Sequence, residues 1–385
     1  MSTLNLPAPA WMTEDVVLLE EQARRFIASE YAPRLEAWNE QGIYDREVWT
    51  KAGAAGLLCP AIPEQYGGAG GSFAHEAVII RELSLAGFDS FGAPLHSGIV
   101  APYILHYGTE EQKRRWLPGL VSGVLVGAVA MSEPGTGSDL QGVRTTAKKS
   151  GNGYVLNGSK TFITNGQHAN LIVVVAKTDP GAGAKGVSLM VVESDNAPGF
   201  RRGRKLNKLG MDAADTSELF FDEIKLPPEN LLGSEEGQGF AQLMNDLPRE
   251  RLIVVVHAQA MMERALALTI DYVKQRRAFG KAIIEFQNTQ FVLAECKSEA
   301  TIARVFHDHC IERYLAGSLD TVTASMAKYW ITDLQGRIID RCLQLFGGYG
   351  YMEEFPISRM YRDARVMRIY AGTNEIMKLL IASSL

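Results

Sequence analysis

The sequence predicts an α+β protein of several domains, in which helices at both ends flank a β-sheet domain. With 385 residues, the chain is too long to fold around a single hydrophobic core of ordinary size. Apolar residues recur with helical spacing up to about residue 117 and again after residue 239, and between these points they alternate as in strands. Strands that follow one another without helices favour an antiparallel barrel or sandwich. We therefore predict an N-terminal helical domain at 1–123, a middle β domain at 124–235 and a C-terminal helical bundle at 236–385.

The composition is that of a soluble globular protein, with 46% hydrophobic and 22% charged residues. A net charge of −5 gives no reason to expect a nucleic acid or an anionic membrane as a partner. No apolar run reaches the roughly 20 residues of a membrane helix, and no export or organelle signal is visible at the N-terminus. We expect a cytoplasmic protein.

The cysteines are scattered, and no pair has the spacing of a metal or disulfide motif. Thiols usually pack as small hydrophobic side chains. We therefore expect separate buried thiols and no metal site, which fits a reducing compartment. The residues concerned are Cys59, Cys296, Cys310 and Cys342.

The elements follow from local patterns. Apolar residues recur at spacings of three and four and predict a first helix, which Thr13 can cap; they are Val16, Leu19, Ala23, Phe26 and Ile27. In the middle domain, the segment 154–163 predicts a hairpin, because its Asn157-Gly158 dipeptide favours a type I′ turn. Further strands are predicted at 172–176, 187–192 and 219–226, and long C-terminal helices at 240–276, 288–316 and 319–346.

The segment Gly181–Gly186 fits the pattern G-x-G-x-x-G and follows a predicted strand. A dinucleotide-binding fingerprint requires a helix after the glycines, whereas the sequence here continues as a strand. We therefore predict a flexible hairpin loop.

Three other segments have residues suited to chemistry. The Gly- and Ser-rich run 131–139 offers backbone N–H groups to a flavin edge or a phosphate, or it is simply a polar turn. The basic run 276–281 on its own favours a helix end that complements its dipole. Glu250 stands between two arginines in 247–252, a setting that is more often a solvated ion pair than a catalytic site.

The run Ala371-Gly372-Thr373-Asn374-Glu375 resembles the C-terminal signature of the acyl-CoA dehydrogenases. The run 131–139 resembles their T-E-P-G-x-G-S-D motif, with Ser132 in place of Thr, and the order of helices and strands is similar over nearly the whole chain. Most members of that family have a catalytic Glu where this chain has Ala371. The resemblance implies that Glu250 is the base here, because it stands at the position used by the long-chain and isovaleryl branches.

The resemblance also implies FAD as the cofactor, an acyl-CoA as the substrate and a homotetramer built as a dimer of dimers. The implied cofactor contacts in the middle domain are Met131, Ser132, Ser138, Phe162, Ile163 and Thr164. The segment that would reach the FAD of a partner subunit supplies Arg276, Phe279 and Gln287. A companion segment near the phosphates is Gln344, Leu345, Phe346, Gly347 and Gly348, and the remaining FAD contacts are Thr373, Asn374 and Glu375. The implied substrate contacts are Ser138, which lies beside the CoA arm, and Arg251, Ala371 and Gly372.

The implied reaction is the α,β-dehydrogenation of an acyl-CoA to a trans-2-enoyl-CoA, with electrons passed to an electron-transferring flavoprotein. The segments 96–100, 203–210 and 247–252 most resemble the long-chain branch, which implies a medium-chain, long-chain or branched acyl group. Two alternatives stay open. One is a non-catalytic assembly protein that binds acyl-CoA and FAD, which the missing Glu at Ala371 allows, and the other is an acyl-CoA oxidase.

Overall fold

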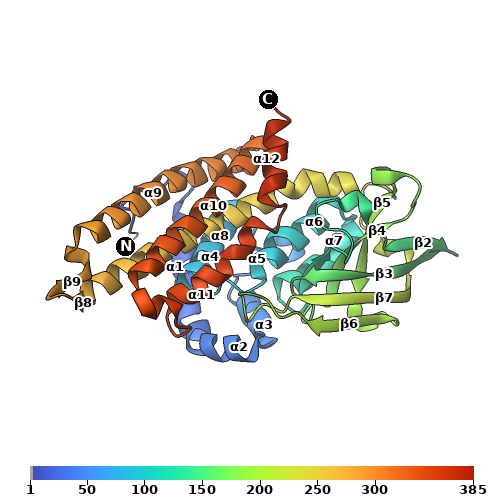
Figure 1. Cartoon of the computed structure of the whole chain (residues 1–385). Coiled ribbons are helices and arrows are strands. Elements are labelled where there is room, and N and C mark those ends of the chain that lie inside the picture. Colours follow the sequence, from blue (N-terminus) through green and yellow to red (C-terminus); the bar gives the residue numbers. More distant parts are fainter. Residues whose placement is uncertain (1–2) are drawn as a thin grey trace.

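A computed structural model describes residues 3–385, and it has helices, a β-sheet domain and helices in that order (Figure 1). The predicted order of the three parts is therefore confirmed. The helices before the sheet are α1 Glu14–Phe26, α2 Leu35–Gln41, α3 Glu47–Ala54, α4 Phe73–Ala86, α5 Ala93–Leu95, α6 Ala101–Tyr107 and α7 Glu110–Val121, with a π-helical turn, η4, at His96–Val100. The helices after it are α8 Gly239–Gln275, α9 Gln287–Leu315, α10 Thr321–Leu345, α11 Pro356–Ala364 and α12 Asn374–Ala382.

The middle domain is one seven-stranded sheet with the order β1-β4-β2-β3-β7-β6, and β5 pairs with β4. Its strands are β1 Gly127–Ala130, β2 Thr146–Ser150, β3 Gly153–Ile163, β4 Leu171–Lys177, β5 Val187–Glu193, β6 Phe200–Lys205 and β7 Ser217–Leu226. The sheet is mixed rather than wholly antiparallel, because β4 runs parallel to β1 and, at one residue pair, to β2. A parallel pair needs a long connection, and β2 and β3 form part of the one between β1 and β4.

The prediction of a hairpin turn at Asn157-Gly158 is wrong. These residues lie inside the continuous strand β3, and the turn between β2 and β3 is formed by residues 151 and 152 instead. The pairing of β3 with β7 shifts register here, and the Asn157 side chain bonds both the backbone N–H and the carboxylate of Glu223 on β7. A Cβ at Gly158 would stand 2.3 Å from the Thr145 hydroxyl oxygen. The dipeptide therefore serves a bulge and a close approach rather than a turn.

Two smaller predictions concern local caps and loops. Thr13 does precede α1, but its hydroxyl donates to Asp15 Oδ1 at 2.6 Å and makes no capping bond to the helix backbone. Residues 178–186 do connect the antiparallel strands β4 and β5 without a following α-helix, so the loop prediction for Gly181–Gly186 is confirmed.

Helix α8 is the central element of the C-terminal domain. It packs against α10, α9 and α4, and its residues from Arg249 to Met262 are almost all buried. Pro248 lies inside this helix, which continues through it without a break. By length and composition α8 could cross a membrane, but 78% of the apolar window is buried within the protein, as in the core helix of a soluble domain.

All four cysteines are buried free thiols. The expectation of buried free thiols is therefore confirmed, and the thiols of Cys296 on α9 and Cys342 on α10 influence each other's pKa. Among residues 3–385 no cluster of three His, Cys, Asp or Glu side chains has the geometry to hold a metal ion.

Candidate active site

Glu250 is a buried carboxylate on α8 with a single close donor. The hydroxyl of Tyr103, on α6, donates to Glu250 Oε1 at 2.5 Å. The pKa of Glu250 is raised to about 7, chiefly by burial and also by the charge of Asp246, while the Tyr103 hydrogen bond and the charges of Arg251 and Arg249 oppose the shift. The interpretation as a solvated ion pair is therefore wrong. A carboxylate with a pKa near neutrality is suited to accept a proton at physiological pH.

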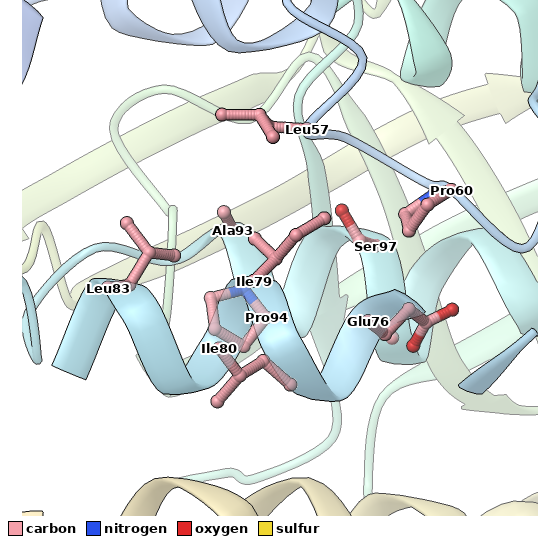
Figure 2. A pocket seen from close by; sticks show the side chains of 10 residues that line it. Leu57, Pro60, Glu76, Ile79, Ile80, Leu83, Ala93, Pro94 and Ser97 are labelled. Carbon is pink, nitrogen blue, oxygen red and sulfur yellow. The ribbon is translucent and has the colours of Figure 1, made fainter. Parts of the chain in front are cut away.

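The α8 segment that bears Glu250 is fixed by an ion pair to α4. The Arg249 guanidinium approaches both carboxylate oxygens of Glu76 at 2.5 Å, and its Nε donates to the carbonyl of Gly98 in the π-helical turn η4. Both charged side chains are buried, and the guanidinium also lies over the ring of Phe73. Glu76 borders an apolar cavity between α4, α5 and η4 (Figure 2).

The residue that stands where a catalytic Glu is usual, Ala371, adopts an unusual backbone conformation. Its φ is +52°, and Gly372 follows with φ +82°, so the two form a left-handed turn just before α12. The backbone N–H of Ala371 donates to no other group among the described residues. Arg251, next to Glu250, is buried and donates to the hydroxyl of Ser325 on α10 at 3.2 Å.

The β domain presents two segments beside each other. Met131 and Ser132 leave the end of β1, and their carbonyls accept bonds from the Lys160 ammonium and the Thr161 N–H of β3. At the end of the same strand, Phe162 has φ +60° and is 69% exposed, while Thr164 is partly exposed. Ser138, further along the first segment, is exposed.

A second group of predicted site residues gathers at the other end of α8. The short hairpin of β8 Arg277–Ala278 and β9 Lys281–Ala282 follows this helix and carries Phe279, which is 95% exposed. Arg276 lies over the ring of Tyr349 at 5.5 Å. The predicted residues exposed in this group are Arg276, Phe279, Gln287, Gln344, Gly347 and Gly348.

The two groups lie far apart within one chain. Arg276 follows Glu250 by 26 positions along a continuous helix, which at 1.5 Å per residue separates them by about 39 Å. The hairpin of β8 and β9 and the β domain accordingly stand at opposite ends of the molecule (Figure 1). One chain cannot bring both groups to one small cofactor.

Some of the predicted FAD-contact residues have side chains that pack in the protein interior. Ile163 is buried in the core of the sheet, and Phe346 stacks on Tyr272 with ring centroids 4.1 Å apart. Leu345 packs against the helical core. Asn374 is buried, and its amide bonds Lys328, Thr332, Tyr329 and Asp333 of α10. Their side chains are therefore part of the packing, and the prediction that they face a ligand applies at most to their main chain.

Sequence reasoning missed Tyr103, Glu76 and Lys328. Tyr103 is 147 positions from Glu250, and Glu76 is 173 positions from Arg249. None of the three belongs to a motif. Tyr, Glu and Lys are common on helices, so the residue types alone do not single these positions out. Only the packing of α4, α6 and α10 on α8 brings them to this part of the structure.

Comparison with known proteins gives matches along nearly the whole chain. Residues 13–124, 128–224 and 237–385 match the N-terminal, middle and C-terminal domains of acyl-CoA dehydrogenases. The chain belongs to the acyl-CoA dehydrogenase family. Long-chain specific acyl-CoA dehydrogenase of Mus musculus is 48% identical over 367 residues, which cover 95% of this chain and 85% of that protein. A crystal structure of an acyl-CoA dehydrogenase from Geobacillus kaustophilus has a TM-score of 0.96 at 50% identity, covering 98% of this chain and 99% of that one. A glutaryl-CoA dehydrogenase from Mycobacterium smegmatis in complex with FADH2 has a TM-score of 0.89 at 29% identity and covers 97% and 95% of the two chains.

The cofactor of this acyl-CoA dehydrogenase is FAD, and the exposed residues fit it. Phe162 and Phe279 offer aromatic faces with little packing of their own. Gly347 and Gly348 have open space where a Cβ would stand, so a phosphate can approach the main chain. Arg276 supplies an exposed cation close to these glycines.

We expect the pH dependence of this acyl-CoA dehydrogenase to follow Glu250. The carboxylate has to be ionised to accept a proton, so kcat/KM should rise about tenfold per pH unit below its pKa of about 7 and level off above it. Tyr103→Phe removes a donor that stabilises the ionised form. Such a bond is worth about 1.5–3 kcal/mol, so the midpoint should move up by about one to two pH units. A pH profile of flavin reduction in both proteins measures this, and an unmoved or lowered midpoint would contradict it.

Proposed function

We propose that this acyl-CoA dehydrogenase removes the α-proton with Glu250 and acts on medium-chain, long-chain or branched acyl-CoA thioesters. The observation that carries the proposal is a buried carboxylate with a pKa near 7 on α8, together with an alanine at the position that usually holds the base. The same observation favours an enzyme over a non-catalytic assembly protein. A protein without turnover has no need of a buried, high-pKa carboxylate.

The proposed roles divide among three elements. Glu250 takes the α-proton, and Tyr103 holds one of its oxygens in place. The free N–H of Ala371 donates to the thioester carbonyl, where negative charge develops as the proton leaves. This donor is main chain, so it does not depend on a Glu side chain at residue 371. Bound FAD supplies the acceptor for the β-hydrogen, which leaves as a hydride.

For the proposed acyl length, the structure offers a small cavity between α4, α5 and η4, with room for about one water molecule. Its lining is mainly apolar and includes Leu57, Ile79, Ile80 and Leu83 (Figure 2). Gly98, at its border, contacts Ile253 one helical turn beyond Glu250. Apolar side chains so close to the proposed base suit contact with an acyl chain. The similarity to the long-chain enzyme of Mus musculus supports the same range.

An anaerobic screen tests the activity and its range. Straight and branched acyl-CoAs of increasing length are mixed with the purified protein, and loss of the yellow flavin absorbance reports reduction. We expect reduction to peak at medium or long chains, and absence of bleaching with every acyl-CoA would contradict the proposal. Reduced protein is then mixed with either oxygen or an electron-transferring flavoprotein. Fast reoxidation by oxygen would identify an oxidase, whereas the proposed partner is the electron-transferring flavoprotein.

The proposed assembly is a homotetramer, a dimer of dimers, in which Arg276 and Phe279 act on the FAD of a neighbouring subunit. The support is the separation of about 39 Å along α8, which prevents one chain from bringing Arg276 and Glu250 to the same FAD. The cytoplasmic location stays a prediction.

Arg276→Ala should therefore weaken FAD retention without changing secondary structure. Loss of a charge-assisted bond to phosphate typically costs about 1.5–3 kcal/mol. The wild type should carry about one FAD per chain, and the variant should lose FAD on dilution in step with dissociation into monomers. Flavin absorbance and light scattering measure the two. Arg277→Ala is the control, because within residues 3–385 the guanidinium of Arg277 bonds only the Gly280 carbonyl of its own hairpin. Equal FAD affinity in wild type and Arg276→Ala would favour a plain helix end.

A further inference from the structure

Lys328 on α10 is a buried lysine whose ammonium faces the left-handed turn at Ala371 and Gly372. Its Nζ donates to the carbonyl of Gly372 at 2.7 Å and to Asn374 Oδ1 at 3.0 Å. The lysine is fully buried, although no carboxylate bonds it directly. A buried ammonium is expensive, so one that bonds a loop carbonyl implies that the position of that loop matters.

The turn itself needs such support. A residue with a Cβ seldom adopts a φ of +52°, and a strained conformation of this kind persists only where its surroundings hold it. Gly372 also has a positive φ, and its carbonyl accepts the bond from Lys328. Without the bond from Lys328, the peptides on either side of Gly372 can rotate and relieve the strain. The Ala371 N–H would then point in a different direction.

Lys328 is also tied to the proposed base through Arg251. The pKa of Lys328 is lowered to about 7, chiefly by burial and also by the Arg251 charge. Arg251 is the neighbour of Glu250 and bonds Ser325, which lies one helical turn before Lys328. The remaining charged groups that face the ammonium are Asp333 of α10 and Glu375 of α12. One short stretch of α10 therefore supports both the side of the site that bears Glu250 and the side that bears Ala371.

We propose that Lys328 is a positioning residue: it holds the carbonyl of Gly372 so that the N–H of Ala371 is aimed at the thioester carbonyl of the substrate. The inference rests on the proposed function, since it concerns the donor that stabilises charge as the α-proton leaves. Lys328 would then orient a main-chain donor, a role separate from the base that a Glu side chain at residue 371 provides in other members of the family.

The test uses a 3-thiaacyl-CoA, in which sulfur replaces the β-methylene. Its α-proton can be removed but no hydride can follow, and the bound anion gives a long-wavelength absorption band with the flavin. The pH midpoint of this band in the holoenzyme reports how well the site stabilises the anion. In Lys328→Met we expect the analogue to bind within a fewfold of wild type, while the midpoint rises by about one to two pH units. The kcat with acyl-CoA should fall by roughly 10²–10³, the usual effect of losing one such donor.

Thr332→Val is the matched control. Thr332 bonds the same Asn374 amide, but it makes no bond to Gly372. We expect this variant to lose thermal stability and to keep the wild-type midpoint. A midpoint that moves as far as in Lys328→Met would reduce Lys328 to a structural role and overturn the proposal.

Should Lys328→Met fail to fold, Lys328→Gln replaces it. Its side chain is polar but one bond shorter, so it cannot reach Gly372 as Lys328 does, and the midpoint should still rise. A wild-type midpoint in whichever of the two variants folds would overturn the role of Lys328. A wild-type protein that binds the analogue but never forms the band would instead contradict the proposed function.

Discussion

Glu250→Gln should retain FAD, bind acyl-CoA and reduce its flavin at least four orders of magnitude more slowly than the wild type. The amide has nearly the shape of the carboxylate and can still accept the 2.5 Å bond from Tyr103, but it cannot accept a proton. A positioned general base is usually worth about 10²–10⁴-fold. The loss should exceed that range because the neighbouring carboxylate of Asp246 lies a helical turn away and faces His106. Stopped-flow absorbance under anaerobic conditions measures the rate.

Two further variants separate base chemistry from folding. Glu263→Gln changes another buried carboxylate of α8, one that pairs with Arg304 and Arg81, and it should cost stability while leaving the reduction rate almost intact. Glu250→Gln combined with Ala371→Glu should recover some activity, because in the proposed site both positions would face the same substrate carbon from different elements. Wild-type reduction by Glu250→Gln would remove Glu250 from the mechanism. Failure of the double variant alone weighs less, since a new carboxylate has to fit beside Arg251 and Lys328.

The sequence predicted the order of helices and strands because periodicity is a local property that survives in any tertiary setting. Local patterns failed where a distant segment decides the outcome. Asn157-Gly158 is a favourable turn dipeptide, yet the close approach of Thr145 and the amide bonds to Glu223 retain it in a strand. Pro248 is a helix breaker by local rules, yet packing on α4 and α10 carries α8 through it.

The candidate site shows the same division. Motif matching found Glu250 and the vacancy at Ala371, because both lie in short runs of distinctive residues. It could not tell that Phe346 and Asn374 point into the protein, since neighbouring residues in a motif face different ways. It also could not find Tyr103, whose relation to Glu250 exists only through the packing of α6 on α8.

The ion pair between Arg249 and Glu76 leads to the second large expected effect, which is on stability. Glu76→Ala leaves the Arg249 guanidinium buried without its carboxylate, with only the Gly98 carbonyl still bonded. Breaking one side of a buried pair typically costs about 3–5 kcal/mol. Denaturation of the holoenzyme should show a loss of this size, whereas Glu36→Ala, which removes an exposed pair with Arg359, should cost less than about 1 kcal/mol.

Removing both charges separates stability from chemistry. Glu76→Leu with Arg249→Met puts apolar side chains of similar size on both helices, and such replacements are often neutral or stabilising, so most of the lost stability should return. The Arg249 charge also opposes the raised pKa of Glu250. The double variant should therefore fold well and yet need a higher pH for flavin reduction than the wild type. A wild-type pH midpoint in the double variant would mean that Arg249 acts on Glu250 only through the position of α8. Stability as low as in Glu76→Ala would mean that the apolar side chains cannot fill the space that the ion pair occupies.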